Sequence, residues 1–383
     1  MRNSWRTIGL AAIGLLAAAA LPAQETPLDP ESSFKINLPA DSPVTLRGAN
    51  MGESRATARG AAMTLELHMG LSLQNTTGNR IRGVTLRVVA QEVTLGGKAS
   101  VAVPSLNVGP GETFPVRIDL QLMRPTQTAN GPLVQVDLDG VLFQDLTFYG
   151  PNRLNSRRSL TAWEMEAQRD RQHFKSVLAA AGPAGLQREM LESLARQAER
   201  PRLDVRVQRG RSVSAAAVGP ERTAQFAFLK FPDAPVEPLE GWAQLAANEA
   251  HAPRIEVKNN SAKPVRYVEL GWIVQDVRGQ QYLAAALPAS DPGLYLPPGR
   301  TARVLQETAL KFSRNGEPVS VQSMAGFVSQ VEFADGKVWV PNRQNLQNAM
   351  LLKVLAPSPE EQRLSDLYRR KGIAALVEEL KKF

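Results

Sequence analysis

The chain contains no cysteine. This absence excludes disulfide bonds, cysteine-ligated metal centres and a lipid anchor attached through an N-terminal cysteine. Only three histidines are present, His68, His173 and His251, and their spacing does not place any two on one face of an element, as metal ligands would require. The sequence therefore predicts no metal site, and the fold must be stabilised by its packed core alone.

The signature motifs of common enzymes are also missing. We find no Gly-x-Ser-x-Gly nucleophile turn, no phosphate-binding loop and no Gly-x-Gly-x-x-Gly fingerprint. Ser32-Ser33-Phe34-Lys35 has the Ser-x-x-Lys spacing of some acyl-transfer enzymes, but it lies in a proline-bounded segment without their later motifs. Asp137-Leu138-Asp139-Gly140 opens like a calcium loop, yet Val141 and Phe148 stand where oxygen ligands are needed, so we interpret it as strand and turn. We predict no catalytic residue and no cofactor.

Long apolar runs are confined to the N-terminus. Arg2 and Arg6 precede an apolar stretch from Ile8 to Leu21, which Pro22-Ala23-Gln24 follows. A basic start, a short apolar run and a small residue at the cleavage point are typical of a secretory signal peptide, which we place at residues 1–23. The run is shorter than the roughly 20 residues that a membrane-spanning helix needs. We expect a periplasmic or secreted protein with no transmembrane segment after cleavage.

The formal net charge is +8, and arginines crowd the middle of the chain between residues 153 and 211. A basic segment can make weak contacts with anionic envelope surfaces. We favour the alternative of a solvated helical linker of mixed charge. No nucleic-acid-binding motif accompanies the charge, so we expect no nucleic-acid partner.

The most informative feature that is present is an internal repeat. Asn75 and Asn259 lie in similar segments, 184 positions apart (259 − 75). The first segment matches at Leu73-Gln74-Asn75-Thr76, Ile81, Val84, Leu86, Val88 and Gln91-Glu92, and the second at Val257-Lys258-Asn259-Asn260, Val265, Val268, Leu270, Trp272 and Gln275-Asp276. Near the module ends the offset is 190, where Tyr149 and Pro151-Asn152-Arg153 correspond to Trp339 and Pro341-Asn342-Arg343. Small steps in offset are what loop insertions cause, so we predict two homologous modules.

Within each module the pattern of apolar residues indicates strands. Residues 64–73 place leucine or methionine at every second position, which is typical of a half-buried strand. Turns rich in Gly and Pro, such as Gly109-Pro110-Gly111 and Pro297-Pro298-Gly299, separate such strands. Short strands with these turns favour an antiparallel β-sandwich.

Each module is followed by a helical pattern. One helix is predicted from about Leu160 to Ala181, broken at Gly182-Pro183, and a second from Ala184 to Gln197. At the C-terminus Pro359-Glu360-Glu361 opens a helix that Gly372 interrupts. We expect its apolar stripe to pack on its own sandwich; a second chain or another protein is the alternative.

These patterns define a fold class and boundaries. The fold is predicted to be mainly β with α, as two immunoglobulin-like antiparallel β-sandwiches, each followed by a helical segment. The boundaries are a signal peptide at 1–23, a Pro-rich linker at 24–40, sandwich 1 at 41–154, a helical linker at 155–200, sandwich 2 at 201–346 and a helical tail at 347–383.

The Asn-Asn-Ser turn, the Val-x-Leu-x-x-x-Val-x-Asp strand (268–276) and the later Pro-Pro-Gly resemble FxLYD-type and related immunoglobulin- or fibronectin III-like modules of bacterial envelope proteins. The resemblance covers about 60 residues in each copy. It implies a mostly non-catalytic, extracytoplasmic role and transfers no functional residue. We therefore predict a non-catalytic protein-interaction or scaffold module of the envelope or surface. Its partner would be another envelope protein or a glycan.

Aromatic residues are scarce, which makes their positions informative. Trp242, Tyr282 and Tyr295 fall in parts of the second module that we interpret as loops absent from the first. They are the candidate binding residues of the alternative function, a glycan-binding module. A second set is predicted to fasten each sandwich to its helix, with Asn and Arg bonding backbone carbonyls: Tyr149, Asn152, Arg153, Trp339, Asn342 and Arg343. An exported hydrolase without a recognisable motif is the third, less favoured function.

Overall fold

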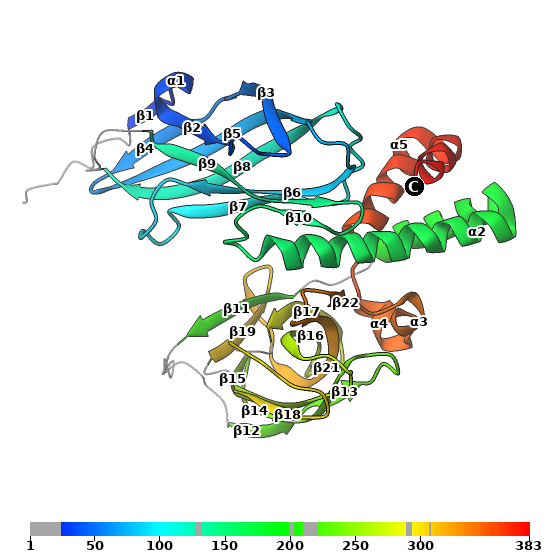
Figure 1. Ribbon diagram of the computed structural model, residues 1–383. Coiled ribbons are helices and arrows are strands. Elements are labelled where there is room, and N and C mark those ends of the chain that lie inside the picture. The colour runs from blue at the N-terminus through cyan, green and yellow to red at the C-terminus, as the bar shows by residue number, and fades with distance from the viewer. Residues whose placement is uncertain (1–23, 127–131, 199–202, 210–220, 289–292, 306–307) are drawn as a thin grey trace, which may run out of the picture.

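The structure is a computed structural model that describes residues 24–126, 132–198, 203–209, 221–288, 293–305 and 308–383. The predicted signal peptide at 1–23 lies outside these residues. Strands dominate and form four sheets, which pair into two bodies with helices between them (Figure 1). The prediction of a mainly β chain with α is confirmed.

The first body contains the two sheets of residues 24–149. Its first sheet consists of β1 (Gln24–Pro27), β3 (Val44–Asn50), β4 (Arg55–Arg59), β5 (Ala62–Asn75) and β8 (Thr113–Pro125). Its second consists of β2 (Phe34–Asn37), β6 (Ile81–Val89), β7 (Lys98–Val103), β9 (Val134–Phe143) and β10 (Phe148–Tyr149). The short helix α1 (Pro30–Ser33) precedes β2. Residues 24–40 were expected to be a linker; instead β1 pairs with β4 and β2 pairs in parallel with β9.

The second body has the same general plan. One sheet consists of β11 (Asp204–Arg209), β12 (Arg222–Gln225), β14 (Val236–Ala246), β15 (Glu249–Asn259), β18 (Thr301–Leu305), β19 (Thr308–Arg314) and β20 (Glu317–Pro318). The other, called sheet C here, consists of β13 (Ala227–Leu229), β16 (Val265–Asp276), β17 (Gln281–Pro288), β21 (Val321–Phe333) and β22 (Val338–Trp339). Strand β13 pairs in parallel with β21, as β2 does with β9.

Alternating side chains from both sheets fill each body. Leu65, Leu67 and Leu73 of β5 pack with Val84 and Leu86 of β6 in the first core. In the second core Trp272 is 3% exposed, and its ring centroid lies 4.9 Å from that of Phe226. In β5 the residues between these leucines are more exposed, so the period of two in the sequence identified its buried face correctly. Strand β6 is buried on both faces, because α2 covers its outer side.

The two matched asparagines make the same set of contacts. Asn75 is fully buried; its Nδ2 donates to the carbonyl oxygens of Asn79 (2.8 Å) and Val108 (3.2 Å). Asn259 is equally buried and donates to Lys263 (2.8 Å) and Leu296 (2.9 Å). Each therefore locks one strand to the following turn and to a distant loop.

Long helices connect and cover the two bodies. Helix α2 (Ser156–Ala198) bends at Gly182, and helix α5 (Pro359–Lys381) bends at Gly372, which confirms both predicted breaks. The short helices α3 (Arg343–Leu346) and α4 (Ala349–Val354) lie between β22 and α5. Among the described residues, no helix is both long and apolar enough to cross a membrane.

We expected the apolar stripe of α5 to pack on its own sandwich, and this expectation was wrong. Leu364, Leu376 and Leu380 form a core with Phe174, Leu186 and Met190 of α2. These residues correspond in pairs with one offset of 190 (364 − 174, 376 − 186, 380 − 190). The two bent helices therefore form one small bundle, to which each contributes equivalent positions.

Candidate functional site

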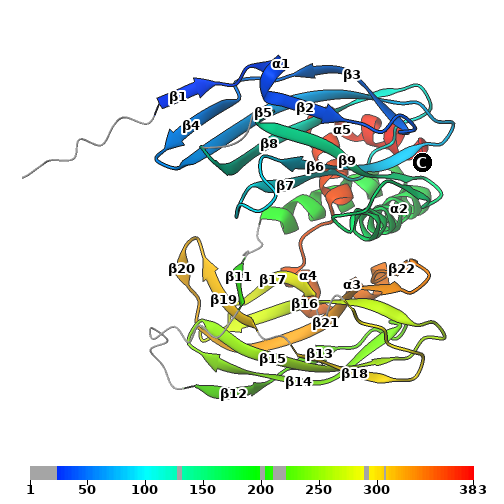
Figure 2. The ribbon, with the colours of Figure 1, turned by 60° about the vertical axis from the view of Figure 1, so that its left-hand side comes forward.

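Helix α2 lies between the two bodies and contacts both (Figure 2). Toward the first body, Leu160 approaches Gly83 so closely that a Cβ at Gly83 would lie 2.8 Å from a Leu160 methyl carbon. Toward the second body, Ala162 packs with Val338 and Val340. The helix is therefore an internal layer of the molecule and not the solvated linker that its charge suggested.

Buried charges join α2 to the first body and to α5. Arg171 donates to the Glu164 carboxylate at 2.6 Å and lies 3.3 Å from Glu360, while Arg82 of β6 lies 3.7 Å from Glu164. All four side chains are at most 5% exposed. Burial raises the pKa of Glu164, and the neighbouring Arg171 and Arg82 oppose that rise. The ring of Phe383 lies over Arg171, 4.2 Å from its guanidinium carbon.

A second set of ion pairs joins α2 to the segment after β22. Arg343 lies 3.6 Å from Asp170, 3.5 Å from Glu189 and 3.4 Å from Glu361. Nearer the start of the helix, Arg158 lies 3.6 Å from Glu332 of β21. Several arginines of the basic segment are thus neutralised inside the molecule and are not available to an anionic surface.

The residues predicted at the sandwich–helix boundary do lie there, with different roles in the two halves. Asp41 accepts a hydrogen bond from the Tyr149 hydroxyl (2.9 Å) in the first. Asp233 accepts from Trp339 Nε1 (3.3 Å) and Asn342 Nδ2 (3.1 Å) in the second.

The paired asparagines and arginines differ in their contacts. Asn152 Oδ1 accepts from the Arg157 amide (2.9 Å), and Asn342 caps α3 by accepting from the Asn345 amide (2.9 Å). Arg153 has an exposed side chain, and its backbone amide donates to Asp139 (2.8 Å). Arg343 makes the ion pairs described above in place of the backbone hydrogen bonds that we expected.

The three candidate glycan-binding residues do not form one surface. Trp242 is on β14, half-buried, with the Arg254 guanidinium 4.8 Å from its ring centroid. Tyr282 is on β17, only 4% exposed, and its hydroxyl donates to Asp276 (3.0 Å). Tyr295 is 64% exposed. Placing Trp242 and Tyr282 in loops was wrong, because both belong to strands, and Tyr282 is a core residue.

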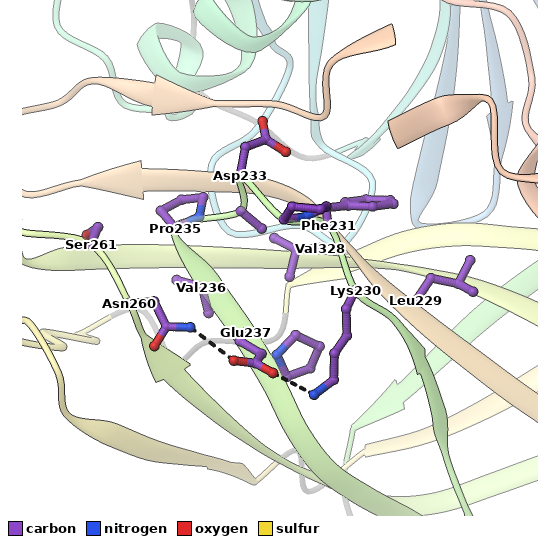
Figure 3. A pocket seen from close by; sticks show the side chains of 13 residues that line it. Leu229, Lys230, Phe231, Asp233, Pro235, Val236, Glu237, Asn260, Ser261 and Val328 are labelled. Carbon is purple, nitrogen blue, oxygen red and sulfur yellow. Dashed lines mark hydrogen bonds and ion pairs between the residues drawn. The ribbon is translucent and has the colours of Figure 1, made fainter. Parts of the chain in front are cut away.

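A cleft of about 540 Å³ lies at one end of the second body. We call it the loop-end cleft; it is lined by residues 229–238, Asn260, Ser261 and Val328. Figure 3 shows Glu237 between Lys230 and Asn260, to which it is joined at 2.5 and 3.0 Å. The hydrogen bond from Lys230 lowers the pKa of Glu237. Asp233 points away from this row, toward its contacts with Trp339 and Asn342.

A second cavity of about 260 Å³ lies between α2 and the outer face of sheet C. Trp163 and Glu166 of α2 face Glu269 of β16 and Gln330 of β21 across it. Sequence patterns did not identify either hollow, because both combine segments far apart in the chain. The strongest available signals were the Asn259-Asn260-Ser261 turn for the first and the Trp163 to Glu166 spacing, one helical turn, for the second.

Among the described residues, no three side chains of the ligating types gather closely enough to hold an ion. His68 pairs with Asp119 (3.2 Å), His173 with Glu189 (3.1 Å) and His251, which is on β15, with Glu249 (3.3 Å).

Comparison with known proteins does not assign this chain to a family. No family model and no curated protein matches the chain. A red sea bream transglutaminase aligns at 8% identity with a TM-score of 0.12, covering 78% of this chain and 31% of that one. A β-glucosidase from Kluyveromyces marxianus aligns at 8% identity with a TM-score of 0.15, covering 69% of this chain and 45% of that one. This chain thus spans less than half the length of either protein, and such low TM-scores carry no argument about function.

Proposed function

We propose that this protein is a non-catalytic, exported scaffold of the bacterial cell envelope or surface that holds two binding modules at a fixed separation. The observation that carries the proposal is the position of α2. Its two sides make buried contacts with the first body through Arg82 and with the second through Glu332, while α5 packs along it. A helix fixed in this way couples the two bodies mechanically.

We further infer that the two bodies are immunoglobulin-like modules that arose by duplication of one sandwich with a bent helix. The equivalent contacts of Asn75 and Asn259 support this inference. The helices support it independently, since His173 pairs with Glu189 as Arg363 pairs with Glu379, 190 positions later (363 − 173 and 379 − 189).

The loop-end cleft is the surface that we assign to a protein partner. It combines the apolar side chains of Leu229, which is partly exposed, and Phe231 with the polar row of Lys230, Glu237 and Asn260. Apolar area with a polar rim is the composition of protein-binding surfaces. Loops at the end of a sandwich are also a common binding location.

The test is capture of partners from the native envelope by the mature protein after cross-linking in place, followed by mass spectrometry. Lys230→Glu together with Asn260→Arg should remove the main partner, because the first change places a carboxylate next to Glu237 and the second fills the cleft. Lys353→Glu on α4, outside the cleft, is the matched control and should retain the partner. Equal recovery with all three proteins would contradict the assignment of the cleft, and recovery of no envelope protein would contradict the scaffold itself.

A further inference from the structure

The cavity between α2 and sheet C is lined by polar and apolar side chains from both elements. Trp163, Glu166 and Arg169 project from one side of α2, spaced at three-residue intervals that place them on neighbouring turns. Phe327, Leu283 and Gly271 of sheet C form the apolar wall. A volume of about 260 Å³ is at the small end of the range for ligand sites, which begins at about 300 Å³ for drug-sized molecules.

A β-bulge turns one polar side chain into this cavity. Glu269 pairs with Gln330 but Leu270 pairs with Val328, so Ser329 is an extra residue on β21. The extra residue places Gln330 on the outer face, toward α2, while Val328 and Val331 point into the core. Without the bulge, an alternating strand would direct residue 330 to the same face as Val328.

Two polar groups on the cavity lining have no hydrogen-bond partner in the part of the chain that the structure describes. Gln330 is 8% exposed, and its Nε2, a donor of two hydrogen bonds, has none. Glu166 makes no hydrogen bond and no ion pair within 4.0 Å among the described residues. Burial raises the pKa of its carboxyl to about 7, so at neutral pH this group can both donate and accept hydrogen bonds. Leaving the buried Gln330 amide unpaired is costly, which indicates that something else satisfies it.

The remaining polar groups limit the charge of a ligand. Glu269 accepts from the Tyr267 hydroxyl (2.8 Å) and the Ser329 hydroxyl (3.2 Å), and its charge would repel an anion. Arg169 is held by Asp170 (2.9 Å) and by the Pro341 carbonyl (2.9 Å), and its charge would repel a cation. A neutral molecule with several hydroxyl groups meets neither repulsion.

We propose that this cavity binds one pyranose ring of a neutral sugar. Hydroxyl groups of the sugar donate to Glu166 and accept from Gln330 Nε2, and the Trp163 ring contacts the apolar face of the pyranose. The site lies on the opposite side of sheet C from the core residue Tyr282 and shares no residue with the aromatic set expected from the sequence. It is also separate from the loop-end cleft, so it gives the scaffold a second kind of ligand.

The test is titration of the full-length mature protein with sugars, followed by saturation-transfer NMR and calorimetry. Probes are the neutral methyl pyranosides of glucose, galactose and N-acetylglucosamine, with tetramethylammonium and acetate as charged probes. We expect saturable binding of at least one pyranoside and of neither ion. The sugar could be a free monosaccharide or the terminal unit of a glycan, and a trisaccharide that ends in the same ring distinguishes the two. It binds as tightly as the methyl glycoside only if the site accepts the terminal unit of a glycan. No saturable binding of any pyranoside, or tighter binding of either ion, would overturn the proposal.

Two variants and two matched controls locate the binding. Gln330→Leu and Trp163→Leu should each raise the dissociation constant at least tenfold. Gln322→Leu, exposed on the same strand, and Trp242→Leu, a tryptophan away from the cavity, should leave it unchanged. Circular dichroism verifies folding, and Trp163→Leu on the partly exposed helix surface serves if Gln330→Leu does not fold. Unchanged affinity in a folded variant of either cavity residue contradicts the proposal.

Discussion

At the scale of single residues, the carboxyl group of Glu166 should make the stability of this molecule depend on pH. Its pKa is raised to about 7 by burial, from 4.5 for a solvated glutamate. The folded state therefore holds a proton between pH 4.5 and 7 that the unfolded state releases, and the stability contributed by this group is lost as the pH rises through that window. Above pH 7 the folded state contains a poorly solvated charge.

Replacement of Glu166 by Gln should remove this pH dependence. At pH 8 we expect the variant to exceed the natural protein in unfolding free energy by on the order of 1–2 kcal/mol, a value reduced from the full shift because the side chain is partly exposed. At pH 4.5 the two should differ little. Urea denaturation at several pH values measures this, with the exposed Glu378→Gln as control. A stability difference that does not change with pH would contradict the explanation.

Arg171 is the second residue whose removal should be costly. It is 4% exposed and shares its charge between Glu164 and Glu360, which are 1% and 0% exposed. Arg171→Met leaves two buried carboxylates with less compensation, so we expect a loss of about 3–5 kcal/mol in unfolding free energy. Lys381→Met, which removes an exposed partner of Glu378, should change it by less than about 0.5 kcal/mol. A loss for Arg171→Met as small as that of the control would mean that these charges are hydrated.

At the scale of elements, the bends of α2 and α5 depend on glycine. Gly182 has φ 65° and ψ −169°, and Gly372 has φ 77° and ψ −177°, a backbone region that residues with a Cβ rarely occupy. No atom lies within 4 Å of an added Cβ at either position, so the cost of a substitution comes from the backbone alone.

Gly182→Ala and Gly372→Ala should each lower the unfolding free energy by about 1–3 kcal/mol. Thermal and urea unfolding measure the change. Gly78→Ala, at a turn where φ is not positive and space is also open, is the control and should cost less than about 1 kcal/mol. If alanine were accepted at 182 and 372 without loss, the chain could bend there by another route.

These elements also show what a sequence can and cannot predict. Strand faces and both helix breaks followed from local patterns, because alternation and glycine act over a few residues. The partner of the α5 stripe did not, since Leu376 and Leu186, which share one core, are 190 positions apart in the chain (376 − 186). The apolar pattern of the sequence does not reveal the bulge at Ser329, so it could not predict that Gln330 lies on the outer face of sheet C.

At the scale of the whole molecule, the arginine-rich middle segment has a different role in the structure from the one that its sequence suggested. In the sequence it is a charged stretch between two modules. In the structure its charges are divided between partners on different sides: Glu332 in the second body, Glu360 in α5, and Glu164, which itself meets Arg82 of the first body. A helix with mixed charge can therefore be central when neighbouring elements supply the counter-charges.

The proposed scaffold requires that the two bodies keep one separation in solution. Because the chain has no cysteine, Thr45→Cys on β3 and Gln225→Cys on β12, both exposed, allow two unique spin labels, one on each body. Double electron–electron resonance should give one narrow distance distribution. Phe174→Asp, placed in the fully buried core between α2 and α5, should broaden it, while Leu191→Asp on the exposed side of α2 should not. A broad distribution in the labelled protein that carries neither helix substitution would show that α2 does not fix the modules, and the scaffold proposal would fail with it.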